Sequence, residues 1–136
     1  MIDKEIIKIA SNTENHGVLD NHTHSSKLKN AICGDEMKIY LIVENDKITN
    51  FKYQCESCIY CQASVSLLSR NAKNKSVENV KNFAKQAQNF FEKNSKSFDN
   101  EWKEFDKILS KNNIARKECL LLPVNTTLDA LNKKSL

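Results

Sequence analysis

Alternating apolar and polar residues predict two neighbouring strands in the first half of the chain. Residues 36–44 carry an apolar residue at every second position, which is the period of a half-buried strand. Residues 48–55 alternate in the same way. Because only the short polar segment 45–47 separates them, we expect an antiparallel hairpin with a tight turn. A preceding strand near residues 27–32 would complete a small meander.

The rest of the chain favours helices. Apolar residues recur at helical spacing in several segments, and Ser76 has the residue type that caps a helix N-terminus. The predicted helices cover residues 2–11, 59–70, 77–91, 101–110 and 128–131, the last one following Pro123 and starting at Thr126 or Thr127.

The order of these elements predicts an α+β fold, in which helices pack on one face of an antiparallel sheet of about three strands. We expect one domain over residues 1–136, with a helix and a polar arm in 1–26 and the core in 27–131. A chain of 136 residues suffices for one hydrophobic core.

Composition and charge exclude several classes of function. The net charge of +4 is small and spread along the chain, so it does not indicate a nucleic-acid interface. No apolar run reaches the roughly 18 residues of a membrane span, and the N-terminus does not resemble a signal peptide. We therefore expect no membrane partner and a cytoplasmic location. Thiols are kept reduced there, so the five cysteines favour metal binding or catalysis over disulfides.

Three of these cysteines fall within seven residues. Cys55, Cys58 and Cys61 form a C-x2-C-x2-C run, which resembles the start of a ferredoxin cluster motif, although the rest of that motif is absent. The run lies where the second strand leads into a helix. A helix N-terminus would favour the thiolate form of Cys58, with Cys61 on the same face.

The remaining two cysteines are less specific when taken alone. Cys33-Gly34-Asp35 can turn sharply and bring a thiolate and a carboxylate together, a mixed ligand pair that zinc accepts, or it can be a structural turn with a buried thiol. Cys119 precedes an apolar run and could equally be a core thiol. His22 and His24 form an H-x-H pair, which we interpret as solvated loop histidines because no spaced partner motif accompanies them.

In three places the sequence resembles the NifU N-terminal, IscU and SufU family of iron–sulfur scaffolds. Residues 30–35 (NAICGD) are similar to the family's N-P-x-C-G-D signature. Residues 57–66 (SCIYCQASVS) are similar to its Gly-Cys followed by x-I-S-x-A-S-x-S. Residues 115–123 (ARKECLLLP) are similar to its A-R-x-x-C with a Leu-rich stretch. The details of the second and third motifs look closest to a bacterial branch of the family associated with the SUF machinery.

The resemblance implies a scaffold that receives sulfur from a cysteine desulfurase. A transient [2Fe–2S] or [4Fe–4S] cluster would be built there and passed to apo iron–sulfur proteins, with other SUF components as partners. Carried over position by position, the ligands are Cys33, Cys58 and Cys119. Asp35 matches the carboxylate that modulates cluster release or completes a Zn²⁺ site.

The chain also departs from the family pattern. The N-P-R-N-x-G segment reads NTENHG over residues 12–17, so its Pro and Arg are lost. Ser57 replaces a Gly, and Glu118 replaces the His of the Isc-type branch. Cys55 and Cys61 are extra. We predict that Cys61 lies close to Cys58, where it could accept persulfide sulfur, as could Cys58 or Cys119, or offer a fourth ligand; otherwise it is a small buried residue.

Four functions remain open at this point. The first is the non-enzymatic assembly scaffold. The second is a zinc-bound sulfur acceptor that takes persulfide sulfur from the desulfurase. The third is a ferredoxin-like electron carrier that uses Cys55, Cys58 and Cys61. The fourth is a structural zinc domain.

Overall fold

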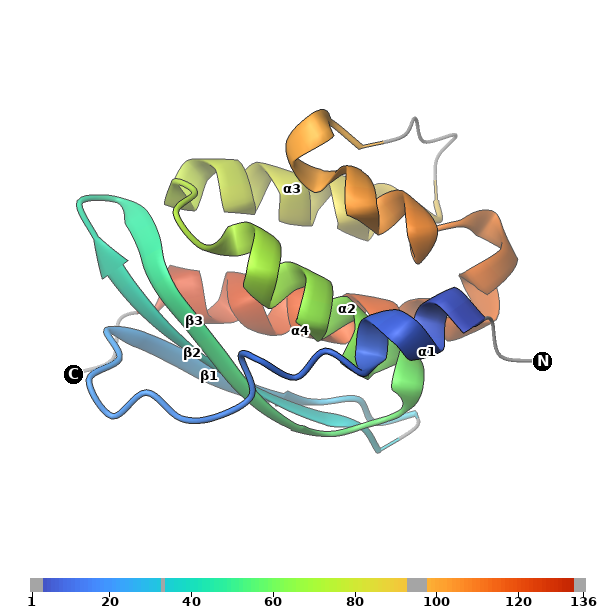
Figure 1. The fold of residues 1–136 in the computed structure, drawn as a ribbon, viewed down its shortest axis with the longest axis horizontal. Coiled ribbons are helices and arrows are strands. Elements are labelled where there is room, and N and C mark those ends of the chain that lie inside the picture. The colour runs from blue at the N-terminus through green and yellow to red at the C-terminus, as the bar shows by residue number, and fades with distance from the viewer. Residues whose placement is uncertain (1–3, 33, 93–97, 134–136) are drawn as a thin grey trace.

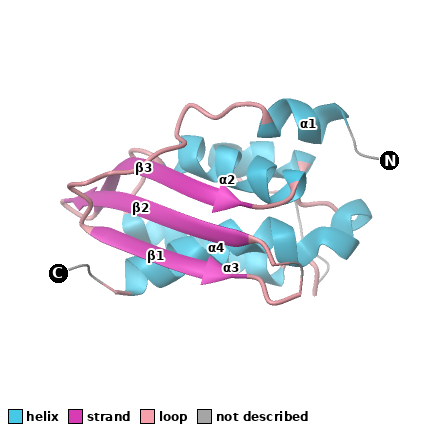
Figure 2. Ribbon diagram, turned by 90° about the horizontal axis from the view of Figure 1, so that it is seen from below, coloured by secondary structure: helices cyan, strands magenta, loops and turns pink. Residues whose placement is uncertain are grey.

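A three-stranded antiparallel sheet forms one layer of the protein, and helices form the other (Figures 1 and 2). The computed structural model describes residues 4–32, 34–92 and 98–133. The elements in chain order are α1 (Lys4–Ala10), β1 (His24–Lys29), β2 (Glu36–Glu44), β3 (Lys47–Glu56), α2 (Ile59–Ala72), α3 (Val77–Asn89), the 3₁₀ helices η1 (Asn100–Lys107) and η2 (Lys111–Arg116), and α4 (Lys117–Asn132). This arrangement confirms the predicted α+β class.

The central strand β2 pairs with β1 on one side and β3 on the other. Its residues Met37, Ile39 and Leu41 are fully buried under the helices, as the alternation predicts. The hairpin turn between β2 and β3 consists of Asn45 and Asp46, which both have positive φ, at 51° and 63°. A two-residue turn of this kind matches the twist of paired strands, so the register of the hairpin follows from the turn.

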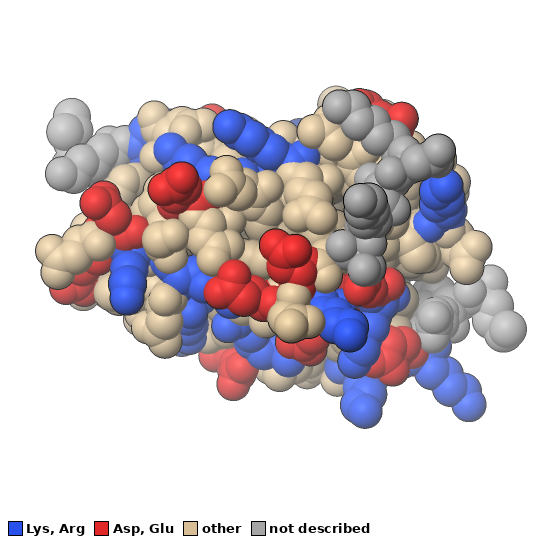
Figure 3. Space-filling view, turned by 90° about the horizontal axis from the view of Figure 1, so that it is seen from above, with Lys and Arg blue, Asp and Glu red and all other residues tan. Residues whose placement is uncertain are grey.

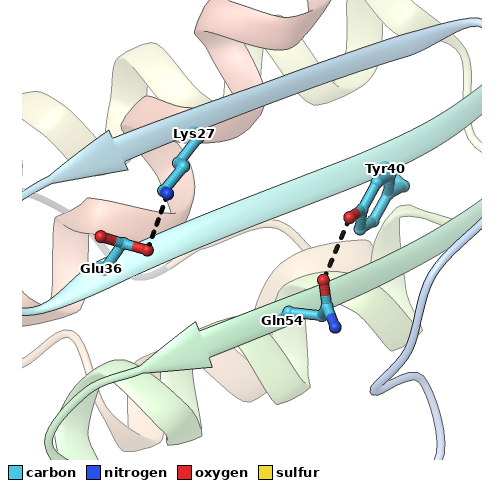
Figure 4. Close-up of polar contacts among 4 residues, drawn as sticks. All are labelled: Lys27, Glu36, Tyr40 and Gln54. Carbon is cyan, nitrogen blue, oxygen red and sulfur yellow. Dashed lines mark hydrogen bonds and ion pairs between the residues drawn. The ribbon is translucent and has the colours of Figure 1, made fainter.

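The opposite face of the sheet is polar. Figure 4 shows two cross-strand contacts on it: Lys27 pairs with Glu36 at 3.1 Å, and the Tyr40 hydroxyl donates to Gln54 Oε1 at 3.0 Å. Figure 2 shows the helices on the other side of the sheet. The single-sided core therefore agrees with the period-two pattern of the strands.

Two helical predictions need correction. The segment predicted as a helix over 101–110 buries Trp102 and Phe105 as expected, but it is the 3₁₀ helix η1. Pro123 does not precede a new helix; it lies inside α4, which runs unbroken from Lys117 to Asn132. An interior proline costs roughly 3 kcal/mol. Here α4 is buried along most of its length, and that packing outweighs the cost.

The polar arm before the sheet is more ordered than the sequence indicates. Strand β1 begins at His24, within the predicted arm, and ends at Lys29 rather than near residue 32. Further upstream, the Gly17 N–H donates to the Tyr53 carbonyl at 2.8 Å, and the Tyr53 N–H donates to the Asn15 carbonyl at 3.2 Å. The arm thus lies along the outer edge of β3.

Figure 3 shows side chains of both charge signs scattered over the helical face among uncharged residues, without a large patch of one sign. One ion pair on the helical side joins Lys107 of η1 to Glu5 of α1 at 3.2 Å. No helix in the described ranges is both long and apolar enough to cross a bilayer.

Candidate metal centre

Three potential metal ligands meet at the end of the sheet where β2 begins and β3 ends. Asp35 directly precedes β2, Cys58 occupies the N-cap position of α2, and Cys119 is the third residue of α4. One ligand atom from each lies within 4.8 Å of the other two. Residues separated by more than eighty positions in sequence are thereby brought together. Cys33, the fourth predicted residue, lies outside the described residues.

Hydrogen bonds close the loop that carries Asp35. The Asn30 N–H donates to the Asp35 carbonyl at 2.7 Å, and the Gly34 N–H donates to the Asn30 carbonyl at 2.8 Å. The Asn30 side chain also accepts from the Ile32 N–H at 3.0 Å. Gly34 has a φ of 75°, a conformation that residues with a Cβ adopt at a cost. The loop therefore holds Asp35 in a fixed position beside α2.

The Asp35 carboxylate is buried and only half satisfied. Its Oδ1 accepts a hydrogen bond from the Cys58 N–H at 3.3 Å. Its Oδ2 is also buried and has no hydrogen-bond partner among the described residues. A buried carboxylate oxygen without a donor is costly, and a cation is one of the few partners that would remove this cost. The Asp35 carboxylate is thus suited to serve as a metal ligand.

The two thiols of the group both lie at helix starts. The Cys58 carbonyl accepts from the Gln62 N–H at 3.0 Å, so Cys58 begins the hydrogen-bond ladder of α2. Cys119 lies in the first turn of α4 and is 5% exposed. Both sulfur atoms are therefore carried by the N-terminal ends of the two helices that meet at the site.

Two contacts hold the starts of α2 and α4 together. The Ser64 hydroxyl of α2 donates to the Leu120 carbonyl of α4 at 2.6 Å, with both residues fully buried. On the rim, the Arg116 guanidinium lies 5.3 Å from the centre of the Tyr60 ring, a cation–π contact. These contacts fix the separation between the helices that carry Cys58 and Cys119.

The spacing of the group fits a four-coordinate metal. Zinc–sulfur bonds of about 2.3 Å in a tetrahedron separate neighbouring sulfur ligands by about 3.8 Å. The observed limit of 4.8 Å is one ångström wider, a difference that small side-chain rotations close. With two sulfurs and one oxygen present, one further ligand is needed to complete a tetrahedral site.

The extra cysteines, Cys55 and Cys61, do not belong to this group. Cys61 is fully buried, and that burial raises the pKa of its thiol well above the ordinary range. The nearby Ser57 hydroxyl opposes this shift in part, while the charges of Cys55, Asp35 and Cys58, in decreasing order, add to it. Burial also raises the pKa of the half-buried Cys55 thiol. Within the described residues, the C-x2-C-x2-C run does not converge on a common point, as a ferredoxin-like carrier would need.

The H-x-H histidines are half-buried rather than solvated loop residues: His24 is the first residue of β1, and the His22 ring lies 5.4 Å from that of Tyr40 in β2. His22 Nδ1 lies 2.6 Å from the Leu19 carbonyl, and His24 Nδ1 lies 2.8 Å from the Thr23 hydroxyl. Neither joins another group of three metal-binding side chains in the part of the chain that the structure describes.

Sequence reasoning missed the supporting residues of the site. The roles of Asn30 in closing the loop, of Ser64 in linking two helices and of the Tyr60–Arg116 contact all depend on tertiary neighbours. Asn30, Tyr60, Ser64 and Arg116 all lie within the three family-like motifs, so the resemblance marked their positions but not their roles.

The protein is thus an α+β domain in which two thiols and a carboxylate converge on one candidate metal site. Residues 1–95 match the family model described as NifU-like N terminal domain. The chain therefore belongs to the NifU-like N-terminal domain family.

Individual relatives agree with this assignment. The chain is 30% identical over 137 residues to the iron-sulfur cluster assembly scaffold protein IscU of Thermotoga maritima, covering 99% of this chain and 95% of that protein. It is 26% identical, with a TM-score of 0.87 and 96% of each chain covered, to a Fervidobacterium islandicum protein assigned as an iron-sulfur cluster assembly scaffold for the SUF system. The N-terminal NifU-like protein of Brucella abortus has the same fold, with a TM-score of 0.89 at 20% identity over 96% of this chain and 91% of that one.

Proposed function

We propose that this protein is a scaffold on which iron–sulfur clusters are assembled and from which they pass to apo-proteins. Cys33, Cys58 and Cys119 are the thiolate ligands in this proposal, and Asp35 is the exchangeable oxygen ligand. The observation that carries it is the convergence of Asp35, Cys58 and Cys119 within 4.8 Å. The scaffold names of the relatives in Thermotoga maritima and Fervidobacterium islandicum support it.

The ligand set suits temporary binding. Thiolates bind iron firmly, whereas a single carboxylate oxygen is a weaker ligand for iron in a sulfur-rich site. Asp35 can hold one coordination position while a cluster is built and yield it to a thiolate of the recipient. The sulfur comes from a cysteine desulfurase, and one of the thiols, Cys58 or Cys119, receives it as a persulfide.

A second candidate is a zinc-bound sulfur acceptor for the same desulfurase. The buried, unpartnered Oδ2 of Asp35 favours it, because this oxygen is ready to ligate a resident divalent ion. The two candidates use the same four residues, with Zn²⁺ held by three sulfurs and one oxygen in place of a transient cluster.

Metal and sulfide content after anaerobic purification separates the two candidates. We expect iron and acid-labile sulfide that move to an apo-ferredoxin when the two proteins are mixed. Tightly held zinc, no transferable sulfide and stimulation of a cysteine desulfurase would instead establish the sulfur acceptor.

Matched alanine variants test the ligand assignment. We expect Cys119→Ala to lose at least tenfold in iron and sulfide content, because it removes one of the converging thiols. Cys55→Ala is the control, because it removes a thiol that lies outside the group. Equal loss in the two variants, or no loss in Cys119→Ala, would refute the assignment.

A further inference from the structure

The N-terminus of α2 carries a further thiol, Cys61, that lies outside the candidate metal group. Cys58 occupies the N-cap position of this helix and Cys61 is its third residue, so the two form a C-x-x-C pair on the first turn. Cys58 is half-buried and Cys61 fully buried in the core beneath it. One thiol is thus within reach of a reagent and the other is shielded behind it.

Helix geometry gives the two cysteines a Cα separation that a disulfide can span. The Cys58 carbonyl accepts the first hydrogen bond of α2, so its Cα already lies on the helical path. Three residues along an α-helix separate Cα atoms by about 5 Å, from a 1.5 Å rise per residue and a 2.3 Å radius. Disulfides span Cα separations of about 4.4–6.8 Å. A Cys58–Cys61 disulfide therefore needs side-chain rotation and no rearrangement of the helix.

From this geometry we infer that Cys61 is a resolving thiol, which releases sulfide from a persulfide formed on Cys58. The inference rests on the proposed function, in which Cys58 is one of the thiols that can receive sulfur. It gives the chain an activity of its own: reduction of sulfane sulfur to the sulfide that a cluster requires.

The step balances within the chain. The Cys61 sulfur attacks the Cys58 sulfur, a bond forms between them, and the bond from Cys58 to the sulfane sulfur breaks. The proton of the Cys61 thiol goes to the departing sulfur, which leaves as hydrogen sulfide. The two cysteines supply both electrons and end as a disulfide. A dithiol reductant of the thioredoxin class then restores the two thiols for the next turn.

The position of Cys61 gives this step its selectivity. Because it is buried, Cys61 has no access to thiols or oxidants in solution, while Cys58 is a permanent neighbour at high effective concentration. Cys119 and Cys55 are the competing thiols. Cys119 Sγ lies within 4.8 Å of Cys58 Sγ, but metal binding uses both of these thiols. Cys55 lies on β3, before the turn that leads into the helix, and helical geometry does not constrain its distance to Cys58.

Sulfide release without added reductant tests the inference. The metal-free protein is treated with inorganic polysulfide, freed of excess reagent, and followed for sulfide and for disulfides by peptide mass spectrometry. We expect the wild type and Cys55→Ala to release sulfide and to accumulate a Cys58–Cys61 linkage. In Cys61→Ala we expect persistent persulfide and release slowed at least tenfold. Equal release from Cys61→Ala, or a linkage from Cys58 that maps to Cys55 or Cys119, would overturn the inference.

A redox equilibrium gives a second readout that needs no persulfide. In mixtures of reduced and oxidised dithiothreitol, the wild type and Cys55→Ala should form the Cys58–Cys61 disulfide in one two-electron transition that Cys61→Ala lacks. No such disulfide at any ratio would equally overturn the inference. Neither experiment contains iron, so neither outcome depends on cluster assembly. A protein that resolves persulfides but does not bind iron and sulfide would disprove the scaffold proposal and leave this inference standing.

Discussion

The hydrogen bond from Ser64 to the Leu120 carbonyl predicts a link between the packing of two helices and metal affinity. Ser64→Ala removes a buried donor and leaves part of a buried carbonyl unsatisfied, which costs about 1–3 kcal/mol in the free energy of unfolding. Leu120 adjoins Cys119, so α4 loses the contact that sets its position against α2. We therefore expect Ser64→Ala to unfold at lower denaturant concentration and to bind Zn²⁺ more weakly.

The size of the affinity change has an upper limit. A lost contact can change binding by no more than the free energy it contributes, and 1.4 kcal/mol corresponds to a factor of ten. The loss of about 1–3 kcal/mol thus sets a limit between about fivefold and about 150-fold weaker Zn²⁺ binding, measured by competition with a chromophoric chelator. Unfolding is measured in urea on the metal-free protein, so that the two effects are separate.

Ser66 provides a matched control on the same helix. Its hydroxyl is also buried and donates to a carbonyl, that of Asn12 in the N-terminal arm, at 2.8 Å. Ser66→Ala should lose similar stability but keep its Zn²⁺ affinity, because the arm carries none of the ligands. Equal affinities for the Ser64 and Ser66 variants, at equal loss of stability, would refute the coupling between α4 packing and the metal centre.

Two further predictions concern the backbone of the site loop and a surface carboxylate. Gly34→Ala should cost about 1–2 kcal/mol in urea unfolding, from the positive φ alone, since no atom lies within 4 Å of the added Cβ; an unchanged midpoint would contradict this. The hydrogen bonds from Ser26 and Lys133 lower the pKa of Asp129. They therefore stabilise the fold at pH values above the ordinary Asp pKa, and this stabilisation is lost as the pH falls through the lowered pKa. An NMR titration should show the Asp129 pKa rising towards its ordinary value in Ser26→Ala, and an identical titration in the two proteins would show that Ser26 has no such role.

The strands could be predicted from sequence because their determinants are local. Strand β2 spans the predicted residues 36–44, and β3 extends the predicted 48–55 by one residue at each end. Alternation marks a one-sided sheet directly, and the polar Asn45-Asp46 pair marks the turn. Ser76 also caps α3 as predicted, by accepting from the Asn79 N–H at 3.0 Å.

Elements that depend on tertiary packing could not be predicted in this way. Pro123 is a local signal against a helix, and only the burial of α4 among β1, β2, α2 and α3 overrides it. The 3₁₀ conformation of η1 likewise accompanies aromatic packing, in which Trp102 stacks on Phe83 with ring centres 4.1 Å apart. Apolar spacing showed which side is buried but not the helix type.

The candidate site likewise has features that the sequence marks and features that depend on tertiary packing. Sequence motifs marked Asp35, Cys58 and Cys119 one at a time, and family resemblance grouped them. Their common location depends on the starts of α2 and α4 lying at one end of the sheet, which no local pattern encodes. Their role as ligands, and that of Cys33, stays a prediction until metal binding is measured.

The pairing of the N-terminal arm with β3 has a consequence for how the protein avoids self-association. A sheet edge with unpaired N–H and C=O groups invites strands from other molecules. Asn15 and Gly17 occupy that position at Tyr53, in the middle of β3. The opposite edge, β1, is only six residues long and bears Lys27 and Lys29. One edge of the sheet is thus paired with the N-terminal arm, and the other edge is short and charged. Both features disfavour edge-to-edge strand pairing between two copies of the protein.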